Sequence, residues 1–223
     1  MRTASLLLAL ASLALPSLAQ DGPVFKADFT NPGLVPSHWV LTIRPDGSSH
    51  FHSERGNPPA RANASTTDPP EVDPPNVDRD IHLSAAFAAH VFQIARSSPF
   101  SRGDCESHAK VAFQGWKKLT VSGPETETVC AFNYSKEKQI QGLGDSLVSV
   151  ANTILEGAKL EALLQYDRLG LDRETEYMLD GVKDGRMQQL CTIRGILQRL
   201  AGDETVMGRV RKRAQLLLAK SGE

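Results

Sequence analysis

The most chemically distinctive residues of the chain are three histidines and a glutamate that fall close together: His38, His50, His52 and Glu54. Neutral imidazoles at positions i and i+2 of a strand, with a third across a hairpin, can ligate zinc or another borderline metal. A strand surface that faces solvent and is simply rich in histidine would show the same pattern. Both interpretations stay open for these four residues, and no cofactor other than a metal ion is indicated.

A β-hairpin is the element that would position these side chains. Residues 38–44 and 48–54 alternate in polarity, and Pro45-Asp46-Gly47 between them suits a three-residue loop that ends in a left-handed glycine. This loop predicts a register in which His38 faces Glu54. One face of the hairpin is then apolar, with Trp39, Leu41, Ile43 and Phe51. The other face carries His38, Val40, Thr42, His50, His52 and Glu54.

The stretch from Cys105 to Tyr134 predicts a second β-rich unit. It contains three runs rich in β-branched and aromatic residues, a pattern typical of a three-stranded antiparallel meander. These runs are 109–113, 116–121 and 128–134. A cysteine stands at the entry, Cys105, and another in the last run, Cys130. In an oxidising compartment we expect these two to form a disulfide across the width of the sheet, which stabilises the fold by ~3–4 kcal/mol in the chain-entropy model.

The first residues predict an export signal. Arg2 precedes an apolar run from Ala4 to Leu15, and small residues follow, so we expect a signal peptide at 1–19 with cleavage between Ala19 and Gln20. The apolar run is about half of the ~20 residues that a membrane span requires. The expected product is extracytoplasmic, either periplasmic or secreted, without a transmembrane span.

Proline marks the connection between the hairpin and the next element. Residues 55–79 contain six prolines and no apolar periodicity, which predicts a proline-rich loop. A helix should follow, capped by Ser84 and ending near Arg96, with one apolar side that covers a face of the sheet.

The C-terminal part has a helical pattern. From Lys136 to Asp167 apolar residues recur at spacings of three and four, and shorter repeats of the same kind continue to the end. The predicted fold is therefore α+β. Residues 20–134 would form an antiparallel sheet, a hairpin plus the meander, with one covering helix. Residues 135–223 would form a bundle of three to four helices packed on or beside it.

Charge and motifs limit the functions that the chain can have. Lys and Arg number 25 against 26 Asp and Glu, a balance that speaks against nucleic-acid binding. The sequence has no phosphate loop, dinucleotide fingerprint, HExxH motif or nucleophile elbow, which disfavours an enzyme. We expect a non-catalytic module that binds a protein or an envelope component. The alternatives are a metal-binding protein or metal-assisted hydrolase that uses His50, His52 and Glu54, and a self-associating structural protein.

Overall fold

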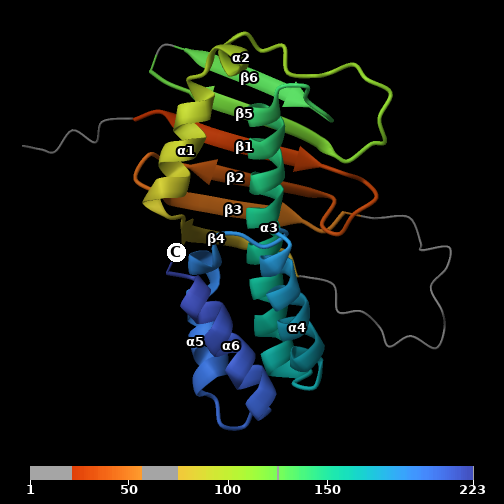
Figure 1. Cartoon of the computed structure of the whole chain (residues 1–223), viewed down its shortest axis with the longest axis vertical. Helices are drawn as coiled ribbons and strands as arrows, with labels where there is room; N and C mark the ends of the chain where they lie inside the picture. The colour runs from red at the N-terminus through yellow and green to blue at the C-terminus, as the bar shows by residue number, and fades with distance from the viewer. Residues whose placement is uncertain (1–21, 57–74, 125, 223) are drawn as a thin grey trace, which may run out of the picture.

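The computed structural model describes residues 22–56, 75–124 and 126–222, and within them the chain is α+β (Figure 1). The first half forms an antiparallel sheet, and most of the helices belong to the second half. The predicted signal peptide, its cleavage site at Ala19 and Gln20, and most of the predicted proline-rich loop lie outside the described residues.

The six strands of the described chain form one sheet in the order β4-β3-β2-β1-β5-β6. Every neighbouring pair is antiparallel. Their bounds are β1 Val24–Thr30, β2 His38–Ile43, β3 Ser48–Glu54, β4 Asp78–His82, β5 Trp116–Ser122 and β6 Glu127–Phe132. The strand β4 therefore begins inside the segment that was expected to be a proline-rich loop.

The hairpin of β2 and β3 has the register that its turn predicts. His38 lies opposite Glu54, and Thr42 lies opposite His50. Gly47 closes the turn with a φ of +86°, and a Cβ at this position would lie 2.5 Å from the carbonyl oxygen of Leu83. Glycine is required here both by the backbone conformation and by the close approach of the following segment.

The predicted three-stranded meander is not formed, because residues 109–113 are irregular and only β5 and β6 arise from that stretch. The place beside β5 is taken instead by β1, a strand that belongs to neither the predicted hairpin nor the predicted meander. Phe25, Ala27 and Phe29 alternate along β1 and are all buried, so this strand gains more from the central position than residues 109–113 could.

Two helices, rather than the single one expected, cover the same face of the sheet (Figure 1). The helix α1 spans Ala85–Ala95, and the Ser84 hydroxyl caps it by accepting a hydrogen bond from the backbone N–H of Phe87. The helix α3 spans Lys138–Tyr166 without interruption. Its first part packs on the sheet, and its last turns belong to a second apolar core with the C-terminal helices.

The remaining helices of the described chain are α2 Ser98–Ser101, α4 Gly170–Lys183, the 3₁₀-helix η1 Leu190–Ile193, α5 Arg194–Gly202 and α6 Gly208–Lys220. The β4 edge of the sheet is protected by other parts of the chain. At the β4 edge, Arg79 forms a bidentate ion pair with Glu161 of α3, at 2.9 and 3.2 Å. Beside the end of β4, the side-chain oxygen of Gln189 accepts a hydrogen bond from the backbone N–H of Ser84. Such coverage prevents pairing with other chains at that edge.

None of the helices in the described ranges is long and apolar enough to cross a membrane.

Candidate functional site

The four residues singled out in the sequence lie on the face of the sheet that α1 and α3 leave uncovered. Their neighbours in the strands, such as Trp39 and Phe51, point the other way into the core. Three aspartates join them from the flanking strands. We call the whole set the histidine–carboxylate array: His38, His50, His52, Asp28, Glu54, Asp78 and Asp80.

The two histidines of β3 contact carboxylates of β3 and β4, and one of these carboxylates contacts both rings. The Nδ1 atom of His50 lies 2.9 Å from Asp80 Oδ1, and its Nε2 atom lies 3.3 Å from Asp78 Oδ1. The Nδ1 atom of His52 lies 2.8 Å from Asp78 Oδ2, and its Nε2 atom lies 3.4 Å from Glu54 Oε1. Asp78 therefore bridges the two rings, one oxygen to each.

The third histidine extends the array across β2 to β1. The Nε2 atom of His38 lies 3.1 Å from Asp28 Oδ1, and its Nδ1 atom lies 3.7 Å from Glu54 Oε2. Imidazoles and carboxylates thus alternate from β4 to β1. At His52, the hydrogen bond to Asp78 raises the pKa, the cost of burial lowers it by less, and the hydrogen bond to Glu54 raises it further, so the pKa lies above the ordinary value.

The metal interpretation of this face stays a prediction. The structure does bring His38, His50, His52 and Glu54 to one surface, as expected. Among the residues that the structure describes, however, no group of three or more His, Cys, Asp or Glu side chains could hold a metal ion as placed. A cation shared by His50 and His52 would have to displace Asp78 from the ring nitrogens that it now contacts.

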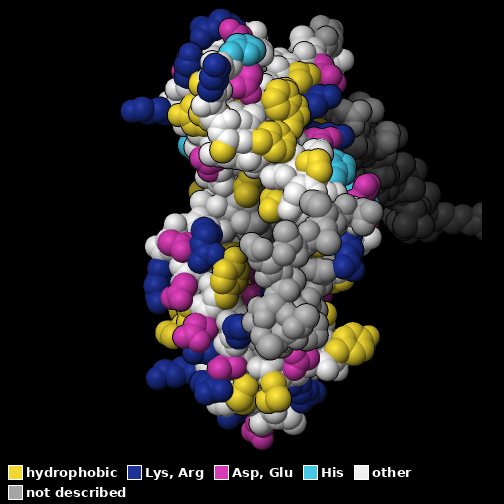
Figure 2. All heavy atoms as spheres, turned by 90° about the vertical axis from the view of Figure 1, so that its right-hand side faces the viewer, with side chains coloured by type: hydrophobic (Ala, Val, Ile, Leu, Met, Phe, Trp, Pro, Cys, Tyr) yellow, Lys and Arg dark blue, Asp and Glu magenta, His cyan; other side chains and the backbone are white. Residues whose placement is uncertain are grey.

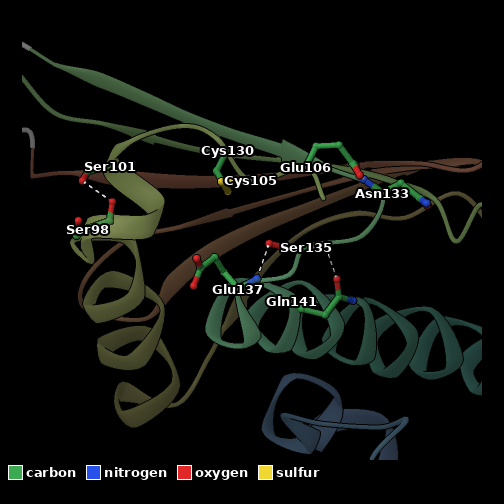
Figure 3. Close-up of a disulfide and its surroundings, with 9 residues drawn as sticks. All are labelled: Ser98, Ser101, Cys105, Glu106, Cys130, Asn133, Ser135, Glu137 and Gln141. Carbon is green, nitrogen blue, oxygen red and sulfur yellow. Dashed lines mark hydrogen bonds between the residues drawn. A yellow bond between two sulfur atoms is a disulfide. The ribbon is translucent and has the colours of Figure 1, made fainter. Parts of the chain in front are cut away.

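A second candidate site starts from the disulfide between Cys105 and Cys130, whose Cα atoms lie 5.5 Å apart (Figure 3). The sequence suggested that this bond would span the sheet. Instead Cys105 lies in the irregular segment 103–115, and the bond ties that segment to the edge strand β6. We call residues 103–115 the anchored loop.

Glu106 is the main polar anchor of this loop. Its Oε2 atom accepts a hydrogen bond from the backbone N–H of Asn133 at 2.6 Å, and its Oε1 atom accepts one from the backbone N–H of His108 at 3.1 Å. Burial alone would raise the pKa of Glu106, but these bonds, with others from Tyr134 and Ser107, together outweigh it and lower the pKa. The carboxylate is therefore charged and held at neutral pH.

Asn133 anchors the other end of the loop with its side chain. Its Oδ1 atom accepts a hydrogen bond from the backbone N–H of Gln114 at 2.7 Å, and its Nδ2 group donates to the carbonyl oxygen of Ala112 at 3.2 Å. The roles of Glu106 and Asn133 were not foreseen from the sequence, because both act on backbone groups that only the folded chain brings near them.

The anchored loop presents apolar side chains to solvent at one end of the sheet. Val111 and Phe113 are 41% and 57% exposed, and Trp116, which starts β5, is 43% exposed. Leu34, in the loop that joins β1 to β2, is 48% exposed at the same end. We call these four residues the apolar end. In the upper half of Figure 2, hydrophobic side chains gather on the face that includes this end of the sheet.

A cavity of about 560 Å³ lies where the helical half meets the end of β4. Its lining includes Cys191, Gln189 and Lys220. Burial, the largest effect, raises the pKa of the Cys191 thiol, so the sulfur stays protonated and weakly nucleophilic at neutral pH. Cys191 is partly buried where it lines this cavity.

Comparison with known proteins assigns no family to the chain. No protein-family model matches it, and no curated protein shows significant similarity to it. The functional case therefore depends on the geometry of the two surfaces described above.

Proposed function

We propose that the protein is an exported, non-catalytic binding module that docks a protein partner outside the cytoplasm through its apolar end, Leu34, Val111, Phe113 and Trp116. The observation that carries the proposal is the firm anchoring of an irregular segment that exposes large apolar side chains. A chain without a binding role would gain stability by burying these groups or replacing them with polar ones.

The anchoring supports recognition of a partner rather than a passive connection. Long irregular segments are uncommon in compact domains unless they serve a function. This segment is fixed by the disulfide of Cys105, by Glu106 and by Asn133. Fixing it before binding reduces the conformational entropy that association costs. The aromatic residues Phe113 and Trp116 belong to the classes that fill interface cores and supply much of the binding energy.

Location outside the reducing cytoplasm is the second part of the proposal. Disulfides persist in secreted and periplasmic proteins and are rare in the cytosol. The Cys105–Cys130 bond is compatible with an extracytoplasmic location. The apolar N-terminal pattern at 1–19, with small residues before Gln20, supports the same compartment.

Replacing Phe113 and Trp116 together by aspartate should abolish partner capture and leave the fold intact, because both side chains are largely exposed. The measurement is cross-linking of the tagged mature protein in an envelope extract, followed by mass spectrometry of the bound species. The matched control replaces Tyr166 and Leu169 by aspartate. These residues are 77% and 78% exposed and belong to the helical half, so their variant should keep the partner.

Two outcomes would contradict the proposal. One is recovery of the same partner in equal amount with the double aspartate variant and with the wild type. The other is capture, through Phe113 and Trp116, of a second copy of this chain, with a mass in light scattering that rises with concentration. That second result would favour the self-associating structural protein.

A further inference from the structure

A cleft of about 400 Å³ lies between α1 and α3, the two helices on the covered face of the sheet (Figure 1). Its floor is apolar, because Ile94 of α1 and Leu143 of α3 are both buried there. Hydrogen-bonding side chains surround this floor, among them Gln93, Gln139 and Ser146. An apolar floor with a few polar groups around it is the usual form of a site for a small molecule.

One wall of the cleft contains a hydroxyl group that bonds to nothing. Ser97 directly precedes α2, a position where serine usually caps a helix, yet its side chain makes no capping hydrogen bond. Its Oγ atom is buried and has no hydrogen-bond partner among the described residues. Buried polar groups without a partner are rare and cost stability. Because rotation about one bond reorients a serine hydroxyl, an acceptor bound in the cleft can satisfy it.

A glycine that the packing of α3 does not require also faces the cleft. Gly142 lies inside the helix, and a Cβ at this position would meet nothing within 4 Å. At Gly144, by contrast, a Cβ would lie 2.9 Å from the ring of Phe132, so close packing explains that glycine. Glycine inside a helix is less stable than alanine. Gly142 therefore keeps the cleft open at a cost to the helix, as a ligand would require.

The charge of the lining favours an anion. Lys138, the first residue of α3, lines the cleft, and its ammonium group has no ion-pair partner in the described parts of the chain. None of the described residues that line the cleft is acidic. A carboxylate bound beside Lys138 would not meet a fixed negative charge in the lining, and it would gain charge-assisted hydrogen bonds from the ammonium and hydroxyl groups.

We propose that this cleft is a binding site for a small organic carboxylate that also carries an apolar group. The carboxylate accepts hydrogen bonds from the Lys138 ammonium group and the Ser97 hydroxyl. The apolar group packs on Ile94 and Leu143, in the space that Gly142 leaves open. Both helices pack on the sheet, so the walls are in place before the ligand binds. The site is independent of docking at the apolar end, and the two proposals stand or fall separately.

The test uses N-acetyl-leucine, a probe that combines a carboxylate, an amide and an apolar side chain, and follows its binding by NMR on the full mature protein. The amide signals of residues 90–97 and 138–146 should shift in a saturable way. The dissociation constant should be on the order of 1 mM, as expected for so small a ligand. The amide of the same probe, N-acetyl-leucinamide, lacks the charge and should bind roughly tenfold more weakly.

Filling the cleft should remove the binding without harming the fold. In the Gly142→Leu variant the new side chain occupies the cleft, so the probe should cause no saturable shifts there. The thermal midpoint should not fall, because leucine forms helices better than glycine. The matched control is Gly195→Leu in α5, where a Cβ also meets nothing within 4 Å, and this variant should bind the probe like the wild type.

Two polar variants test recognition separately from folding. Ser97→Ala removes a hydroxyl that bonds to nothing in the described chain, so the thermal midpoint should stay, while the dissociation constant rises roughly tenfold. Lys138→Gln should raise the dissociation constant of N-acetyl-leucine roughly threefold and leave that of its amide unchanged. The proposal is overturned if the probe causes no saturable shifts at the cleft, if its amide binds equally well, or if Gly142→Leu or Ser97→Ala keeps the wild-type affinity.

Discussion

Replacement of Lys159 by methionine is expected to lower the free energy of unfolding by ~3–5 kcal/mol. Lys159 of α3 is 8% exposed, and its Nζ atom lies 2.7 Å from Oε2 of Glu174 in α4, which is 3% exposed. A second carboxylate, that of Glu156, lies 3.8 Å from the same nitrogen. Without the ammonium group, the Glu174 carboxylate would stay buried beside another acid. Urea denaturation measures the loss.

Two further variants show whether burial is the reason. Lys159→Met combined with Glu174→Met removes the uncompensated charge and should recover most of the lost stability. Lys183→Met breaks an exposed pair with Asp180, whose Nζ–Oδ1 distance is 2.8 Å, and should leave the free energy of unfolding nearly unchanged. Equal losses of unfolding free energy for Lys159→Met and Lys183→Met would show that burial does not make the Lys159–Glu174 pair more important for stability than an exposed pair.

Removal of the disulfide by Cys105→Ala and Cys130→Ala is the second large effect, with an expected loss of about 3 kcal/mol. The bond closes a loop with a sequence separation of 25 residues and so restricts the unfolded chain. Both cysteines are buried, so the loss also includes the packing of the two sulfur atoms that alanine does not replace. Thermal or chemical denaturation under oxidising conditions measures the difference from the wild type.

The location of the effect is as informative as its size. Hydrogen exchange in the anchored loop should become faster in the double alanine variant, while the β2–β3 hairpin keeps its protection at low denaturant. The control is Cys191→Ala, which removes only the unpaired thiol and should leave the exchange of the anchored loop unchanged. An anchored loop that exchanges equally slowly without the disulfide would mean that Glu106 and Asn133 suffice to hold it.

The hairpin and its two faces could be predicted because the information is local. The turn residues before Ser48 set the register, and the alternation of polar and apolar side chains sets which face is buried. The cap of α1 at Ser84 and the long apolar periodicity of α3 are local in the same sense. The cysteine pairing followed from the small number of cysteines in the chain.

What the sequence could not predict depends on contacts between distant segments. Residues 109–113 are rich in apolar residues and directly precede β5 in the sequence, whereas β1 is distant from β5 in the sequence and yet pairs with it. The three aspartates of the histidine–carboxylate array come from β1 and β4, the strands on either side of the hairpin. Asp78 and Asp80 belong to β4, which begins within a segment whose prolines predicted a loop. Their role was visible only once the strand pairing was known.

Photo-cross-linking from position 113 tests the central claim, a preorganised docking surface at the apolar end, most directly. A photoreactive phenylalanine analogue would replace Phe113 in one protein and Tyr166 in another, each exported and irradiated in its native compartment. We predict one discrete cross-linked partner from position 113, lost on Trp116→Asp, and none from position 166. The same products from both positions, or no product that depends on Trp116, would contradict the account.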